Sequence, residues 1–377
     1  MKFAMYCDRP ARGGIGNYAR EIAKRIPGIE LGFIGHLGDK GFGVGNMTYP
    51  IREEGTKRLL HTEGVDYTAL TDQEVLEADL HHGVDASLSW IVPKVNKSVI
   101  TLHDIDDEYR IELTGIVNRP YLEPHLADYL KQATRIIVDS KYMEKRALGS
   151  GMPENKIRVV YCGADTEIFK PYDGSRGDLR GELEEKVSLL KQIRGKRIII
   201  NNSSEETRKN VPDVLKAFAR IRRNVKDVAL IRIGYPEVPQ KDSNVNLQHI
   251  LGIDRETLYI NMKVDRETIA HLYNISDLML FPTVREGFGL VFAEAMASEC
   301  PIVAYQATTA PEVVGQGGLL VPLDSGPEGL AYACLKILED DNLHKVLGKN
   351  GRKRVEENFT WEKAAEATMK VYNEVLE

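Results

Sequence analysis

The sequence predicts an α/β protein with two doubly wound domains, each built on a parallel sheet that helices cover on both faces. Three observations indicate this fold. Short apolar and β-branched runs alternate with amphipathic helical stretches along the chain, a pattern typical of parallel sheets. The alternation gives way to a charged helical stretch at 171–195 and then restarts. The 377 residues are enough for two domains of ordinary size.

The first part of the alternation forms the predicted N-terminal domain, residues 1–170. A strand at 3–6 leads into a helix at 17–26, which the following Pro-Gly pair ends. Residues 36–65 are rich in glycine and irregular, so we expect a mobile loop region there. Further strands are predicted at 31–34, 99–102, 135–138 and 157–160, and helices near 121–132 and 141–149.

The second part forms the predicted C-terminal domain, residues 196–358, which follows a linker at 171–195. The last stretch, 359–377, has Thr360 in a helix-capping position and a mostly apolar stripe at helical spacing, as in helices packed on a core. The strands predicted in the C-terminal domain are 198–200, 228–231, 258–260, 278–281, 302–304 and 319–321. The helices predicted there are 211–223, 266–274, 290–299 and 327–338.

The composition argues against several classes of function. The net charge is −6 with both signs interspersed, so the chain lacks the basic face that nucleic-acid binding needs. No apolar run approaches 18 residues, so we expect a soluble, cytoplasmic protein. We assign no acidic pair to metal binding and expect no cofactor. The cysteines lie far apart and are expected to be small buried residues rather than disulfides or zinc ligands: Cys7, Cys162, Cys300 and Cys334.

The stretch 282–297 is the most informative in the chain. A predicted buried strand ends where it begins, a glycine-rich turn at 287–289 follows, and then a helix-forming run. This order aims backbone N–H groups and the positive end of a helix dipole at one point, which favours an anion. Glu286 and Glu294 flank the turn, and they fit beside an anion if they accept hydrogen bonds from sugar hydroxyls. A phosphate flanked by sugars indicates a nucleotide-sugar.

The residues from Glu286 to Leu290, then Glu294 with the short run after it, and the stretch 301–304 resemble the signature of retaining glycosyltransferase family 4. The resemblance implies the GT-B architecture, in which two Rossmann-like domains face each other across a cleft and the last helix crosses back to the N-terminal domain. It also implies that Glu286 meets the transferred sugar and Glu294 the ribose. A lone pair of glutamates would be interpreted as solvated surface acids, but the turn and the strand here favour the functional interpretation.

Two motifs of the N-terminal domain extend the resemblance. A loop containing Gly14 and Gly16 opens the first helix and by itself indicates only a tight turn. Family 4 has a similar loop that approaches the donor diphosphate and the acceptor. His103 ends a predicted strand, at the edge where open α/β sheets hold ligands. It resembles the histidine of the family's His-Asp motif, which contacts the transferred sugar, although a lone histidine is more often structural.

A charged segment after the first strand of the second half resembles the family's phosphate-binding element and places its lysine at Lys209. A charged hydrogen bond to the diphosphate would contribute about 1.5–3 kcal/mol; a solvated charge run at a helix start is the alternative. The family has Gly-Arg five to six residues upstream, where this chain has Ser203-Ser204, so half of the cationic clamp is absent. Arg208 is adjacent, and we expect the two cationic side chains to diverge so that only Lys209 reaches the phosphate.

The stretch 258–264 resembles the element that lines the family's base pocket, so we expect its backbone to meet the base. The diphosphate is expected to meet Lys209 and the first N–H groups of the helix that starts near Gly289. The residues expected to be catalytic are His103 and Glu286. The residues expected to bind the donor are Gly14, Gly16, Ser204, Arg208, Lys209, Met262, Val264, Gly287, Phe288, Gly289, Leu290 and Glu294.

We therefore expect a metal-independent hexosyltransferase that uses GDP-mannose or a UDP-hexose and a glycan or lipid-linked acceptor. The resemblance implies that it retains the anomeric configuration. A sugar-nucleotide epimerase, a disaccharide synthase and a catalytically silent nucleotide-sugar binding module are the alternatives, and the intact glutamate pair argues against silence. Lys141, Lys145 and Arg146 on one predicted helix could contact the inner face of a membrane, although a solvated face is more common. The sequence predicts neither the acceptor nor the oligomeric state.

Overall fold

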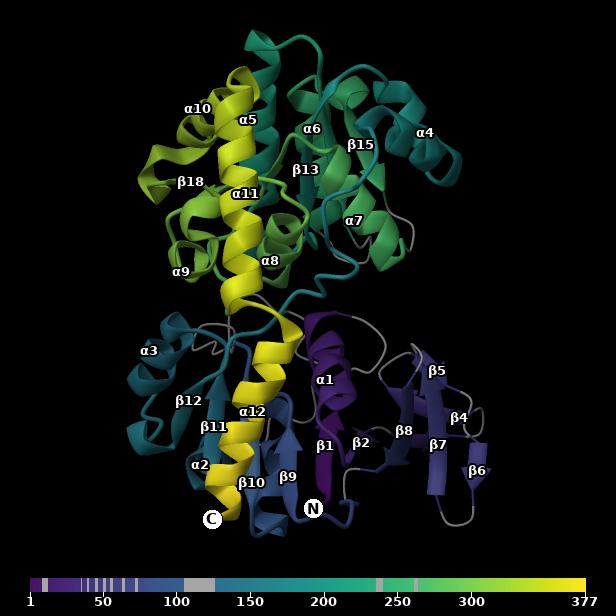
Figure 1. Cartoon of the computed structure of the whole chain (residues 1–377), viewed down its shortest axis with the longest axis vertical. Coiled ribbons are helices and arrows are strands. Elements are labelled where there is room, and N and C mark those ends of the chain that lie inside the picture. The colour runs from purple at the N-terminus through teal and green to yellow at the C-terminus, as the bar shows by residue number, and fades with distance from the viewer. Residues whose placement is uncertain are drawn as a thin grey trace. The chain divides into compact units, whose positions relative to one another are not determined.

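The chain divides into two compact units, each with a parallel sheet (Figure 1). The first unit comprises Met1–Cys162 and Trp361–Glu377, and the second comprises Gly163–Thr360. The structure is a computed structural model, and it describes residues 1–8, 13–34, 36–38, 41–44, 47–49, 52–54, 57–62, 65–71, 74–104, 126–234, 240–260 and 264–377. The predicted α/β class is confirmed.

The first unit contains a sheet whose strands follow the order β12-β11-β10-β9-β1-β2-β8-β7-β6. The strands from β12 to β8 are parallel, and β7 and β6 are added antiparallel at one edge. Their bounds are β1 Phe3–Cys7, β2 Ile29–Ile34, β6 Arg52–Glu54, β7 Lys57–Thr62, β8 Val65–Leu70, β9 Leu80–Gly83, β10 Ser98–Leu102, β11 Arg135–Val138 and β12 Ile157–Val159.

The glycine-rich stretch 36–65 does not form the expected loop region where the structure describes it. It contains β6, β7 and a separate antiparallel sheet of β3 (His36–Gly38), β4 (Gly41–Val44) and β5 (Met47–Tyr49). The prediction was wrong because hairpins need turn-forming residues such as glycine, so a high glycine content does not distinguish a long loop from short hairpins.

Helices of the first unit pack against its parallel sheet and against one another. The last helix, α12 (Trp361–Leu376), contacts both α1 (Gly14–Arg25) and β9. Trp361 is fully buried with its ring centroid 6.1 Å from that of Tyr18, and Tyr372 lies 5.0 Å from Phe3. The remaining helices are η1 Ala86–Lys94, α2 Leu126–Gln132, α3 Lys141–Gly149 and η2 Glu154–Lys156, where η denotes a 3-10 helix.

The second unit contains a six-stranded parallel sheet in the order β15-β14-β13-β16-β17-β18. The chain starts in the middle at β13 and builds outwards to β15, then returns to β16 and builds the other way. The loops after β13 and β16 therefore lie at the switch point where open α/β sheets bind ligands. The bounds are β13 Arg197–Asn202, β14 Val228–Ile233, β15 Thr257–Ile260, β16 Leu278–Leu280, β17 Ile302–Tyr305 and β18 Gly318–Val321.

The helices of the second unit enclose a large apolar core. Phe218 on α5 and Leu330 on α10 are fully buried in it, together with the sheet residue Leu280. The α-helices are α4 Arg176–Lys186, α5 Val211–Asn224, α6 Gln240–Ile250, α7 Arg266–Ile275, α8 Leu290–Ala297, α9 Ala310–Val314, α10 Gly326–Glu339 and α11 Asp341–Asn358. The 3-10 helices are η3 Ser188–Ile193, η4 Thr207–Lys209, η5 Asp254–Glu256, η6 Gly315–Gly317 and η7 Leu323–Ser325.

Residues 171–195, suggested by the sequence as a linker, lie within the second unit. There α4 packs against α7 and buries Leu179 and Leu183. All four cysteines are buried and free, as expected from their spacing. Among the described residues, no helix combines the length and the apolar character needed to cross a membrane.

Candidate functional site

The loops that follow β13 and β16 bring the predicted phosphate-binding and sugar-binding residues together in the second unit. The two strands pair directly, with Ile199 opposite Leu278. Hydrogen bonds then join the loops themselves, because the Val284 N–H and the Thr283 hydroxyl both donate to the carbonyl oxygen of Arg208 at 2.9 and 3.1 Å. The backbone of one loop is thus fixed against the backbone of the other.

Lys209 and Glu286 form an ion pair at this junction. Lys209 Nζ donates to Glu286 Oε2 at 2.6 Å, and the side chains are only 12% and 14% exposed. Arg208 Nη1 lies 3.4 Å from the same oxygen, while Arg208 Nε donates to Glu206 at 2.6 Å. The expectation that Arg208 and Lys209 diverge was therefore wrong. Both side chains leave the tight turn η4, and the guanidinium is long enough to return to Glu286.

The turn before α8 is built around Gly289. Its φ is +83°, in the left-handed region that glycine adopts without strain, and it occupies the N-cap position of α8. A Cβ there would lie 2.6 Å from the Phe292 ring and 3.2 Å from Glu286 Cγ. The sequence predicts this strand-turn-helix order, and the structure has it, with Gly287 in the turn and Leu290 as the first helical residue.

Phe288, expected in the donor site, has its side chain in the interior of the second unit. It is 3% exposed, and its ring centroid lies 5.4 Å from that of Phe359. Its side chain therefore stabilises the turn and does not offer a surface to a ligand.

Glu294 lies one turn further along α8. Burial raises the pKa of its carboxyl group to about 7, although the charge of Arg266 acts in the opposite direction. A shielded carboxylate of this kind is stabilised by hydroxyl donors, which the two hydroxyls of a ribose would supply.

Two other predicted donor-binding residues of this unit follow the strands β13 and β15. Ser204 is partly exposed in the loop between β13 and η4, and Val264 is partly exposed just before α7. Met262 lies outside the described residues.

An ion pair that the sequence analysis missed lies beside this loop. Glu205 and Arg232 are almost fully buried and 2.5 Å apart, and Asn244 Nδ2 donates to the other Glu205 oxygen at 2.7 Å. The only signal in the sequence is an arginine inside the otherwise apolar strand β14. Glu205 neutralises Arg232, so Arg232 does not replace the arginine that is missing at Ser204.

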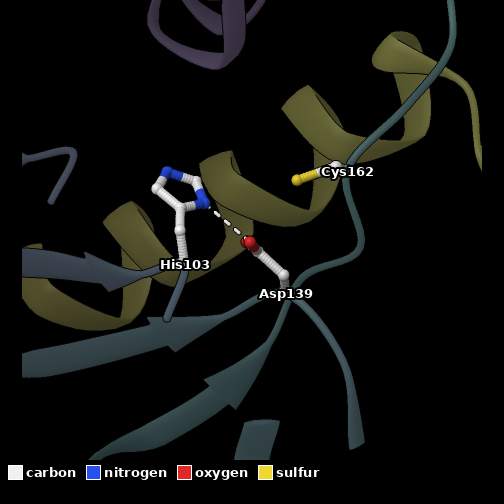
Figure 2. Close-up of side chains that lie close together, drawn as sticks. All are labelled: His103, Asp139 and Cys162. Atoms are coloured by element: carbon white, nitrogen blue, oxygen red, sulfur yellow. Dashed lines mark hydrogen bonds and ion pairs between the residues drawn. The ribbon is translucent and has the colours of Figure 1, made fainter. Parts of the chain in front are cut away.

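The first unit holds the remaining predicted residues. Gly14 is the first residue of α1 and Gly16 is buried in its first turn, whereas the positive φ of +90° belongs to Gly13 at the N-cap. His103 follows β10 directly. Its Nδ1 donates to Asp139 Oδ2 at 2.6 Å, and Figure 2 shows this bond with Cys162 on the other side of Asp139.

The group of His103, Asp139 and Cys162 has the spacing that a metal site would need, since one ligand-type atom of each lies within 4.8 Å of the others. The contacts that the structure shows are hydrogen bonds, with Asp139 between His103 and Cys162. Burial and then the charge of Asp139 raise the pKa of the Cys162 thiol well above its ordinary value, so the sulfur keeps its proton. Nδ1 of His103 is already bonded to the carboxylate. The sequence analysis missed Asp139, although it follows a predicted strand next to that of His103.

Comparison with known proteins finds a glycosyltransferase family model for each part of the chain. Residues 12–168 match the family model described as Glycosyltransferase Family 4, and residues 185–354 match the model described as Glycosyl transferases group 1. The chain is 31% identical to the uncharacterized glycosyltransferase MJ1178 of Methanocaldococcus jannaschii over 97% of this chain and 96% of that protein. It is 27% identical to N-acetyl-alpha-D-glucosaminyl L-malate synthase of Bacillus anthracis over 74% of this chain and 68% of that protein.

A solved structure gives the same fold. Alr3699/HepE of Anabaena, in complex with UDP and glucose, matches with a TM-score of 0.74 at 17% identity, over 99% of each chain. Because the sequence identity is low, this structural likeness establishes the GT-B fold alone.

Proposed function

We propose that this chain, which belongs to glycosyltransferase family 4, transfers a hexosyl group from a UDP-hexose or GDP-mannose to a glycan or lipid-linked acceptor, with retention of anomeric configuration. Membership of the family makes it a glycosyltransferase that uses a nucleotide-sugar. What we propose is the sugar, the nucleotide base and the acceptor that the chain uses. The structural neighbour that is in complex with UDP and glucose supports a UDP-hexose as the donor.

The ion pair of Lys209 and Glu286 at the start of α8 carries the proposal. One loop supplies a cation for the diphosphate, the other supplies a carboxylate for sugar hydroxyls, and Gly289 opens a helix whose dipole favours negative charge. Glu294, one turn away, has the shielded carboxyl group that suits the ribose. These groups offer one partner for each part of a nucleotide-sugar: the ribose, the diphosphate and the sugar.

The chemistry that these residues perform is electrostatic. When the bond from the anomeric carbon to the diphosphate breaks, negative charge grows on the leaving oxygen and positive charge grows on the sugar ring. Once the donor is bound, Lys209 and the first N–H groups of α8 stabilise the leaving group without moving further. Binding of the diphosphate draws Lys209 away from Glu286, and the freed carboxylate then orients the hydroxyls of the sugar. For His103 we propose a hydrogen bond to another hydroxyl of that sugar.

Incubation with radiolabelled UDP-glucose, UDP-N-acetylglucosamine or GDP-mannose, without acceptor, tests the proposal. Transferases of this kind release free sugar slowly by passing it to water, and we expect one of the donors to be hydrolysed. Lys209→Ala should abolish most of this release, whereas Lys226→Ala, on the surface of the same unit, should leave it unchanged. Accumulation of an epimer would indicate an epimerase, and binding without turnover of any donor would contradict the proposal.

A further inference from the structure

Three neighbouring strands of the first unit each deliver one side chain to the same place. The strands β10, β11 and β12 are adjacent in the sheet, and His103 and Asp139 come directly after the first two. Cys162 follows the third strand by three residues. All three side chains therefore lie at the carboxyl edge of a parallel sheet, the edge at which such sheets bind ligands. Only His103 is predicted from the sequence to act in the reaction.

The hydrogen bond between His103 and Asp139 is short and buried, and it uses only one of the two ring nitrogens of His103. Asp139 is 2% exposed, and its Oδ2 lies 2.6 Å from Nδ1 of His103. In Figure 2 the other ring nitrogen, Nε2, lies on the side of the ring away from Asp139. Nε2 is buried and has no partner among the residues that the structure describes. A buried ring nitrogen without a partner is costly, so its orientation requires a reason.

A second histidine, His82, has the environment of an ordinary structural residue and serves as a comparison. Both ring nitrogens of His82 are bonded to hydroxyl groups, Nδ1 to Tyr372 and Nε2 to Thr101, each at 2.7 Å. Burial, and then the positive charge of His103, lower the pKa of His82 to about 3. His82 is therefore a neutral, fully bonded residue of the core.

The pKa of His103 is shifted in the opposite direction to that of His82. Burial lowers the pKa of its imidazole, but the charge and hydrogen bond of Asp139, followed by the charges of Asp85 and Asp104, outweigh burial and raise it. The ring of Tyr18 packs edge-on against His103 at 4.8 Å, and burial raises the pKa of that phenol too, so Tyr18 is neutral. The Cys162 thiol is also neutral. Asp139 is thus the charged group in direct contact with His103.

We propose that Asp139 is a positioning residue for the sugar transfer: its carboxylate holds the proton on Nδ1 of His103 and fixes the ring, so that Nε2 is the nitrogen presented to the transferred sugar. This inference rests on the proposed function for its substrate, but not for the state of the histidine. With Nδ1 committed to Asp139, Nε2 is the nitrogen left to hydrogen-bond a sugar hydroxyl, as a donor when the ring is charged and as an acceptor when it is neutral. Loss of Asp139 would release the ring and allow the proton to move to the wrong nitrogen.

The state of the ring is measured by long-range ¹H–¹⁵N NMR on the full chain, labelled on histidine and treated with a chelator so that no metal ion fixes the ring. His103→Gln identifies the signal. In the unsubstituted chain we expect the neutral ring above its pKa to carry its proton on Nδ1. In Asp139→Asn we expect the titration midpoint to fall by about 1 pH unit or more and the Nε2-protonated form to appear. Asp85→Asn is the matched control, since Asp85 acts only by its charge; its midpoint should fall less and the proton should stay on Nδ1.

The same variants are then compared in donor hydrolysis and in binding of the nucleoside diphosphate. Asp139→Asn should lower turnover by about 10²-fold, the size expected for a misplaced catalytic group, and leave diphosphate affinity unchanged. A neutral ring protonated on Nε2 in the unsubstituted chain overturns the inference even if Asp139→Asn does not fold. An unchanged midpoint in a folded Asp139→Asn also overturns it. Because the NMR experiment contains no donor, absence of hydrolysis in every variant would contradict the proposed function and the part of the inference that concerns the sugar, whereas the control of the His103 ring by Asp139 would be judged by NMR alone.

Discussion

Lys209 Nζ lies 2.6 Å from Glu286 Oε2, so a cation expected to bind the donor diphosphate is already neutralised by a carboxylate of the same site. Arg208 Nη1 approaches the same oxygen at 3.4 Å. A diphosphate must compete with Glu286 for these cations before it can bind. The ion pair therefore couples two events, capture of the diphosphate and release of the carboxylate that is to orient the sugar.

Glu286→Gln removes the negative charge that competes with the diphosphate for Lys209, and it keeps the shape of the side chain. Affinity for the nucleoside diphosphate should rise about tenfold, equivalent to 1.4 kcal/mol, while turnover falls by about 10²-fold or more. Calorimetric titration and donor hydrolysis measure the two effects. Glu206→Gln is the control, because Glu206 pairs with Arg208 and not with Lys209; its affinity should change less. Weaker diphosphate binding by Glu286→Gln would contradict the coupling.

Lys209→Ala should abolish most of the activity, and Arg208→Ala should have a mild effect. The structure brings both cations to Glu286, but Arg208 is shared with Glu206 and lies further from the carboxylate oxygen. Steady-state donor hydrolysis by the two variants separates their contributions. If Arg208→Ala is crippling and Lys209→Ala is tolerated, the lysine has been assigned the wrong role.

Gly289→Ala should destabilise the second unit and lower its melting temperature. Backbone strain in the left-handed region costs about 1–2 kcal/mol, and the new Cβ would also meet the Phe292 ring at 2.6 Å. Gly252→Ala separates the two causes, because Gly252 has φ +64° but no atom within 4 Å of the place that a Cβ would occupy. Thermal unfolding should show a larger loss for Gly289→Ala. Equal losses would mean that the close packing around the turn contributes nothing.

Glu294 should make the stability of the fold depend on pH. Its pKa is raised from 4.5 to about 7, so between these values the folded chain binds more protons than the unfolded chain. The free energy of unfolding should therefore fall as pH rises through this interval and stay level above it. Glu294→Gln lacks this effect. Its free energy of unfolding, relative to that of the unsubstituted chain, should therefore rise by on the order of 2–3 kcal/mol between pH 4.5 and pH 8. Urea denaturation across this range measures the difference; a difference independent of pH would refute the raised pKa.

The alternating pattern predicted most of the architecture, because a parallel strand or an amphipathic helix depends on residues close together in sequence. The strand-turn-helix at Gly289 was predicted for the same reason. The hairpins within 36–62 were missed because short strands with interleaved glycines lack a long apolar period. Their pairing depends on contacts between segments, which composition does not reveal.

The candidate site was predicted unevenly. Glu286 and Lys209 were each selected by resemblance, but their ion pair depends on β13 lying beside β16, and strand order is not a local property. Asp139 was missed for the same reason, since it becomes a partner of His103 only because β10 and β11 are neighbours. Roles tied to one loop can be predicted from sequence, whereas pairings between loops require the fold.

Calorimetric titration of UDP and GDP into the unsubstituted chain and Glu294→Ala is the most direct test that the second unit binds a nucleotide-sugar. We expect one nucleotide to bind with a stoichiometry of about one per chain, since the proposal assigns one donor site to the chain. Glu294→Ala should bind it at least about tenfold more weakly, because the ribose loses its carboxylate partner. If neither nucleotide binds, or if Glu294→Ala binds as tightly as the unsubstituted chain, the assignment of the donor site is contradicted.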